Sequence, residues 1–283
     1  MIQAIIQGLL LGGLYAIIGV GMSMIFGIVR ITNLAHGDFL ILAGYISHIV
    51  MGMLGVNPFV SLIIVLPVMF CIGYAVQSTM LNKVLGRGAE PPLLVTFGIS
   101  IIIQNLLLYF FTANAMKLKS ELLLKSIVIT ETIRIPVMYL TGCIIGVAVI
   151  LLLNFYMSKT YMGRAIKATS DDSNAAQLMG VNIRITYGIA MGISMMTAGV
   201  AGVLMGMLFN FYPTSGSSYL IIAFAVVIIG GIGSINGTLL AGFVFGLAQA
   251  LGGFFLGTVY QQLIAYLVMI IMLIVRPQGL LSK

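Results

Sequence analysis

The sequence predicts an all-α fold, a polytopic membrane helix bundle with about 8–10 transmembrane helices. Hydrophobic residues make up 61% of the 283 residues, charged residues only 7%, and the mean hydropathy is +1.19. A soluble domain carries roughly 25% charged residues, so a water-soluble fold is excluded. The charges are also confined to short stretches, and residues 185–275 carry none. At about 20 apolar residues per crossing, that block alone holds three or more helices.

Apolar runs along the chain predict nine helices. Their ranges are roughly 4–29, 39–55, 59–82, 93–113, 136–157, 186–211, 219–235, 238–257 and 260–275. The second and seventh are short, and Gly230, Gly231 and Gly233 interrupt the seventh. Short, glycine-broken segments can be re-entrant, because non-helical backbone survives at membrane depth beside protein. Eight, nine or ten crossings are therefore compatible with the sequence.

The basic residues orient these helices by the positive-inside rule. Nine of the 13 fall in loops that we expect to be cytoplasmic: Arg30, Lys83, Arg87, Lys159, Arg164, Lys167, Arg184, Arg276 and Lys283. The other four lie in an expected external loop at about 114–135. We expect one membrane domain over 1–283, an external N-terminus and a cytoplasmic loop at about 158–185. The net charge of +7 then reflects topology in a lipid bilayer, with no nucleic-acid partner.

Two short segments of the chain echo each other. Residues 33–44 and 213–224 are both polar, glycine-containing turns that lead into a short apolar helix. Inverted repeats of a transporter would place the two turns on opposite faces of the membrane. Two unrelated helix starts would look the same.

Small residues recur every fourth position in one helix, at Ser194, Ala198, Gly202 and Gly206. In lipid, such a stripe lets neighbouring helix backbones approach closely. It indicates helix packing, either ordinary or around a transport pathway.

The sequence contains no constellation that indicates catalysis. A phosphate-binding Gly-Lys-Ser/Thr loop is missing, and two histidines are too few for a metal cluster. We expect no acidic or basic residue near the centre of a span, which argues against ion-coupled transport. Sodium sites made of carbonyls and hydroxyls would escape this test. The chain is thus expected to be no enzyme and to hold no cofactor, so energy for uphill transport would come from another chain.

Polar side chains within apolar segments are the candidates for a translocation pathway. They are Tyr15, Asn33, His36, Gln104 and Asn105. Buried amides are costly in a membrane unless they are paired. Each candidate therefore either lines a pathway or bonds a neighbouring helix, and Asp38 is expected to be the N-cap of the second span.

The segment 162–183 is the most polar part of the chain and predicts a short amphipathic helix. Thr169 and Asp172 have the spacing of a capping box, and acidic residues favour a helix start. Gly180 suits a left-handed stop. The helix would present Ala175, Leu178 and Met179 on one face, either to a groove of a cytosolic partner or to solvent.

Several motifs in a fixed order resemble one family. They are Asn33-Leu34-Ala35-His36-Gly37-Asp38, Gln104-Asn105, the 163–180 loop, the 230–237 glycine-rich turn and Arg276-Pro277-Gln278-Gly279-Leu280. Together they resemble the permease subunits of branched-chain amino acid ABC importers. The tail, Leu280-Leu281-Ser282-Lys283, departs from the Phe-Gly that is more common there.

The resemblance implies a multi-pass protein of the bacterial inner membrane. Its expected partners are two cytoplasmic ATPase subunits that bind ATP and Mg, a second permease chain (related or identical) and an extracytoplasmic substrate-binding protein. The resemblance also implies that the 163–180 loop contacts the ATPase. The expected coupling residues are Gly163, Arg164, Ala165, Ala168, Asp172, Ala175, Leu178 and Gly180.

The resulting hypothesis is ATP-driven import of a small amphipathic solute, with branched-chain amino acids as the first choice. Urea, short amides or other amino acids are alternative cargoes for the same machinery. A stand-alone channel or an ion-coupled secondary transporter is the alternative from another class.

Overall fold

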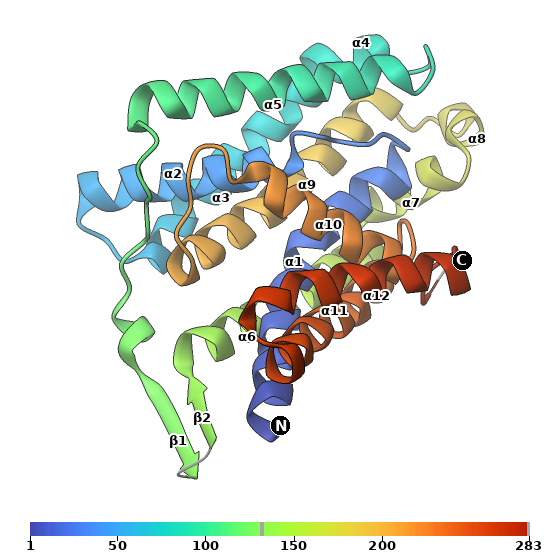
Figure 1. Cartoon of the computed structure of the whole chain (residues 1–283). Helices are drawn as coiled ribbons and strands as arrows, with labels where there is room; N and C mark the ends of the chain where they lie inside the picture. Colours follow the sequence, from blue (N-terminus) through green and yellow to red (C-terminus); the bar gives the residue numbers. More distant parts are fainter. Residues whose placement is uncertain (131–132, 282–283) are drawn as a thin grey trace.

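A computed structural model describes residues 1–130 and 133–281 as a helical bundle with one β-hairpin (Figure 1). The helices are α1 (Ile2–Ile28), α2 (His36–Leu54), α3 (Pro58–Val76), α4 (Asn82–Val84), α5 (Glu90–Phe111), α6 (Val137–Lys159), α7 (Tyr161–Asp171), α8 (Ser173–Leu178), α9 (Ile183–Leu208), α10 (Gly216–Gly230), α11 (Ile235–Leu256) and α12 (Gln261–Val275). A π-helical turn, Gln77–Leu81, joins α3 to α4, and strands β1 (Ser126–Thr130) and β2 (Ile133–Pro136) pair antiparallel.

Eight helical segments are long and apolar enough to cross a membrane, which confirms the predicted fold class. All nine expected apolar segments are helical. The seventh, α10, has 15 residues and a length of about 22 Å, less than the roughly 30 Å of a bilayer core. It can complete a crossing only together with the non-helical chain before it.

The bundle has two distinct ends, with α7 and α8 at one and the β-hairpin at the other (Figure 1). We call them the α8 end and the hairpin end. Eight of the nine residues predicted to be cytoplasmic lie at the α8 end, in loops, at helix termini or in the short helices α4 and α7, and Lys283 lies outside the described residues. The external loop predicted at 114–135 forms the hairpin end and carries Lys117, Lys119, Lys125 and Arg134.

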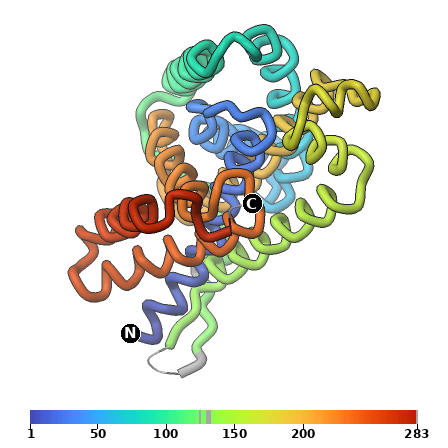
Figure 2. Tube along the Cα trace, turned by 90° about the vertical axis from the view of Figure 1, so that its right-hand side faces the viewer, coloured from blue at the N-terminus to red at the C-terminus, as the bar shows by residue number. Residues whose placement is uncertain are grey.

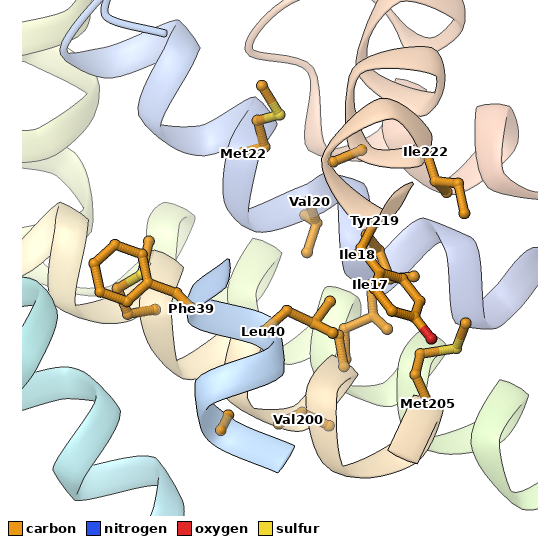
Figure 3. Packing of buried hydrophobic residues seen from close by; sticks show 14 of the residues in the cluster. Ile17, Ile18, Val20, Met22, Phe39, Leu40, Val200, Met205, Tyr219 and Ile222 are labelled. Atoms are coloured by element: carbon orange, nitrogen blue, oxygen red, sulfur yellow. The ribbon is translucent and has the colours of Figure 1, made fainter. Parts of the chain in front are cut away.

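Two long helices, α1 and α9, form the centre of the bundle. In each, 83% of the most apolar window is buried. Figure 3 shows side chains from α1, α2, α9 and α10 converging on one apolar core, among them Ile17, Ile18, Leu40, Val200 and Tyr219. The remaining helices surround this core, with α5 and α12 on opposite sides of it (Figures 1 and 2).

The helices that precede α6 in the sequence and those that follow it pack against each other in a crosswise pattern. Helix α1 packs on α11 and α10, while α9 packs on α3 and α2. Small residues make both main contacts close. A Cβ at Gly12 of α1 would lie 2.6 Å from the backbone of Phe243, and one at Gly192 of α9 would lie 2.6 Å from the Phe70 ring. This arrangement supports two repeats, α1–α5 and α9–α12.

The two similar turns do not lie on opposite faces as predicted; they meet inside the bundle. A Cβ at Gly37 would overlap the carbonyl oxygen of Gly216. The reason is that the chain turns back after α1. Atom Nε2 of His36, at the start of α2, lies 3.0 Å from the carbonyl oxygen of Ile18, ten residues or about 15 Å before the end of α1.

Candidate functional site

The junction between the two broken spans is the first feature of the site. We call residues 33–54 the first half-span and residues 213–230 the second half-span. Their helices, α2 and α10, start beside each other and run toward opposite ends of the bundle (Figure 1). Two positive helix N-termini therefore meet inside the protein.

Asp38 lies at this junction and is only 2% exposed. Its Oδ1 atom lies against Gly216, where even a methyl group would overlap it. The same oxygen accepts a hydrogen bond of 3.0 Å from Nε2 of Gln104 in α5. A carboxylate in this position is stabilised by both helix N-termini and by the amide donor.

The predicted role of Asp38 as a helix cap is wrong. It is not the N-cap of α2, because the helix begins at His36 after Ala35 and Asp38 is its third residue. Asn33 instead organises the start, its Oδ1 accepting a 3.1 Å hydrogen bond from the Ala35 amide. Asp38 is nevertheless buried inside the bundle, because the turn before α2 enters it.

Four of the five predicted pathway residues belong to this junction or to α5. Asn33 and His36 are 2% and 0% exposed, and Gln104 bonds Asp38. Asn105 is exposed and donates to the Ile101 carbonyl of its own helix at 2.8 Å. These side chains bond neighbouring helices or their own helix, and they do not line the largest described cavity, to which Tyr15 belongs.

The fifth residue, Tyr15, lines a cavity of 740 Å³ that opens at the hairpin end between α1, α6, α9, α10, α11 and α12. Its hydroxyl lies close to the Gln249 side chain. Among the described lining residues there is no acidic or basic side chain. The polar ones are Gln3, Gln7, Tyr15, Tyr139, Asn210, Ser215, Ser218, Tyr219, Gln249, Gln261 and Gln262.

Sequence reasoning missed most of this amide-rich lining. One signal was available in α1, where Gln3, Gln7 and Tyr15 are separated by multiples of four residues and so share one helix face. The contributions of α11 and α12 become visible only once those helices are packed beside α1.

The small-residue stripe of α9 lies between helices. Ser194 donates a 2.7 Å hydrogen bond to the Gly21 carbonyl of α1, and Ala198 is fully buried. A Cβ at Gly202 would overlap the Leu40 carbonyl of α2. Gly206 faces Leu118 and Phe211 at the hairpin end. The stripe thus accommodates α1 and the first half-span.

The polar 162–183 segment forms two helices, so the predicted capping box is wrong. Thr160 caps α7, whereas Thr169 lies within α7 and donates to the Ala165 carbonyl at 2.8 Å. Asp172 caps α8 and accepts from the amides of Asn174 (2.9 Å) and Ala175 (3.0 Å). Gly180, at φ +86°, ends the segment in the left-handed conformation that was predicted.

Most of the expected coupling residues lie on the surface of the α8 end. Leu178 and Met179 are 88% and 85% exposed. The other exposed members of the set are Arg164, Ala168, Asp172, Ala175 and Gly180. Gly163 and Ala165 are buried, and a side chain at Gly163 would overlap the backbone of α6. These two pack α7 onto the bundle.

Residues 4–273 match the family model described as "Branched-chain amino acid transport system / permease component". The chain belongs to this family. It is 28% identical to the high-affinity branched-chain amino acid transport permease BraD of Pseudomonas aeruginosa, over 100% of this chain and 96% of that protein. The permease LivH of Escherichia coli strain K12 is 27% identical over the same shares.

Two further matches are more distant. The fructose import permease FrcC of Rhizobium meliloti is 29% identical over 75% of this chain and 60% of its own length. A chain of the PsaBC structure from Streptococcus pneumoniae, solved with a Fab, matches with a TM-score of 0.50 and 15% identity. It covers 97% of this chain and 92% of that chain, and it shows the fold alone. The family match makes the chain a multi-pass, non-catalytic membrane subunit of an ABC transporter.

Proposed function

We propose that the permease imports a small amphipathic solute, with branched-chain amino acids as the first choice, in a bacterial inner-membrane complex. Two cytoplasmic ATPase subunits would bind ATP and Mg, and a second permease chain and an extracytoplasmic binding protein would complete the complex. The family match over residues 4–273 carries the proposal. The names of BraD and LivH supply the cargo class.

The α8 end is the proposed docking site for the ATPase. Its basic residues orient it to the cytoplasm, and α8 presents two long apolar side chains from a capped helix. Movement there can reach the core, because Ser170 of α7 donates a 2.7 Å hydrogen bond to the Gly27 carbonyl of α1. The carbonyl of Ser170 also accepts from the Arg30 guanidinium at 3.3 Å.

The 740 Å³ cavity is the proposed point at which solute enters, delivered past the 114–135 loop and the 213–218 turn. Its amide and hydroxyl groups can replace water around a polar head, and its apolar residues can take a hydrocarbon side chain. The likeness to FrcC makes a sugar the competing cargo. Urea and short amides would fit the same uncharged lining.

Co-purification from native membranes tests the complex. We expect an ATPase in a one-to-one ratio with permease chains and, after reconstitution with the binding protein, uptake that requires ATP. Competition among labelled leucine, fructose and urea identifies the cargo. A solitary chain that moves solute in liposomes without nucleotide would contradict the proposal and indicate a channel or secondary carrier.

Asp172→Lys tests the coupling element. It removes the cap of α8, worth about 1 kcal/mol, and reverses a charge at the docking surface. We expect ATP-driven uptake and stimulated ATP hydrolysis to fall at least about tenfold, or about 1.4 kcal/mol. The matched control is Glu90→Lys, the same charge reversal at an exposed position at the start of α5, outside the 163–180 loop. Normal uptake by the Asp172→Lys variant would contradict the assigned role.

A further inference from the structure

A second, smaller cavity lies at the α8 end beneath α7, separate from the solute cavity. It has a volume of 290 Å³, close to the lower limit of about 300 Å³ for small-molecule sites. Its walls come from α1, α6, α7 and the turn that begins α11. Met24, Ile28 and Met157, all buried, form the apolar part. One small molecule with an apolar portion fits this space.

Two opposite charges face this cavity from α7. Lys167 and Asp171 are separated by four residues, a spacing at which side chains on a helix are neighbours. Within residues 1–130 and 133–281, neither makes an ion pair. The Lys167 ammonium bonds only the Ser158 hydroxyl, at 3.2 Å, and Asp171 has no side-chain partner in the same ranges. A cation and an anion are therefore both available to a ligand.

The opposite wall supplies a complementary pair of amides. Nδ2 of Asn154 in α6 donates to Oδ1 of Asn236 in α11 at 2.5 Å. This bond leaves the Asn154 oxygen as a free acceptor and the Asn236 nitrogen as a free donor among the described residues. Helix α11 also begins here, at Ile235, and its positive N-terminus favours a carboxylate.

We propose that this cavity binds a zwitterionic amino acid with an apolar side chain from the cytoplasmic side. Lys167, the Asn236 amide and the α11 N-terminus would hold the carboxylate. Asp171 and the Asn154 oxygen would hold the ammonium group, and the apolar wall would take the side chain. A simple anion would be repelled by Asp171, and a simple cation by Lys167. The inference rests on the proposed function for the ligand class and for the orientation of the α8 end.

Occupancy would regulate import. The ligand would join α7, which leads directly into α8, to α1, α6 and α11. A ligand that binds one arrangement of these helices better than another stabilises that arrangement. Imported amino acid that accumulates in the cytoplasm would restrict the movement of α7 and α8 and so slow further import.

Proteoliposomes containing the whole complex provide the test. They carry the ATPase side and ATP in the lumen, with binding protein and labelled L-leucine outside. We expect unlabelled L-leucine in the lumen to slow the initial rates of uptake and ATP hydrolysis about tenfold at saturation. Lys167→Gln and Asp171→Asn should each abolish this inhibition, with every variant compared with its own rate without lumenal leucine. Lys159→Gln, an exposed charge outside the cavity, should leave the inhibition intact.

Ligand analogues test the same site without any substitution. Isopentylamine lacks the carboxylate and 4-methylpentanoate lacks the ammonium group, so neither should inhibit the unmodified complex. Active transport that lumenal leucine does not inhibit would overturn the inference and leave the proposed function standing. Inhibition that persists in both variants, or that either analogue reproduces, would overturn it as well.

Failure of ATP-driven leucine uptake by the unmodified complex would instead count against the proposed function. In that case, calorimetry with the purified complex, without the binding protein, tests whether the cavity binds L-leucine. Binding that Lys167→Gln and Asp171→Asn remove supports the site, and the absence of binding overturns it.

Discussion

The first and second half-spans both begin inside the bundle, yet the first is sealed by its neighbours whereas the second borders the solute cavity. His36 and Asp38, at the start of α2, are 0% and 2% exposed. At the start of α10, Ser218 is exposed and lines the 740 Å³ cavity together with Ser215. Ser218 is the third residue of α10, and Asp38 is the third residue of α2.

The helices that face the two half-spans explain this difference. Helix α5 closes over the first half-span, with Gln104 bonding Asp38 and the Thr96 hydroxyl accepting from the Leu34 amide at 3.2 Å. Helix α12, which holds the corresponding place in the second repeat, contributes Gln261 and Gln262 to the far wall of the cavity. One half-span therefore acts as a fixed joint, and the other as a wall of the candidate pathway.

The largest effect is expected where the half-spans touch. Gly37→Val would drive a side chain into the Gly216 carbonyl, and backbone on both sides prevents a simple adjustment. We expect a loss of stability of about 3 kcal/mol or more, seen as loss of monodisperse protein in size-exclusion chromatography. Gly52→Val on the same helix, where nothing lies within 4 Å, is the control and should behave normally. A stable Gly37→Val protein would break the comparison.

A smaller effect is expected from the bond that seals the first half-span. A thermal-unfolding cycle of Asp38→Ala, Gln104→Ala and the double variant should give a coupling of about 1.5–3 kcal/mol, the range for a hydrogen bond to a charge. Asn105→Ala, at the next position, removes only a bond within its own helix and should cost about 0.5 kcal/mol or less. Additive single effects would show that α5 does not hold the junction.

The smallest effect on stability is expected in the second half-span. Ser218→Leu fills part of the cavity without removing a side-chain hydrogen bond among the described residues. We expect unfolding to change by less than about 0.5 kcal/mol, while ATP-driven uptake falls about tenfold. Unimpaired uptake would remove this half-span from the pathway, and a large loss of stability would make it a second fixed joint.

The local features of the chain were not all equally predictable from the sequence. Gly180 ends its helix as expected, because a left-handed residue depends on its own backbone freedom. The start of α8 was misplaced, because Thr169 has capping chemistry but lies inside α7, which begins earlier at the cap Thr160. Of the five predicted pathway residues, only Tyr15 lines the cavity. Gln7 and Gln249 also line it, but they were not predicted from the sequence.

The sequence by itself determined that this is an integral membrane protein, roughly where its helices lie and which loops carry its charge. These properties follow because each apolar run must be long enough to cross the bilayer core, and because basic residues concentrate in the loops on the cytoplasmic side. Only the tertiary structure decided that Asp38 is buried against Gly216, that Gln104 seals it and that Tyr15 meets Gln249 across a cavity. Lipid does not distinguish one apolar helix face from another, so close packing between distant segments chooses the partners.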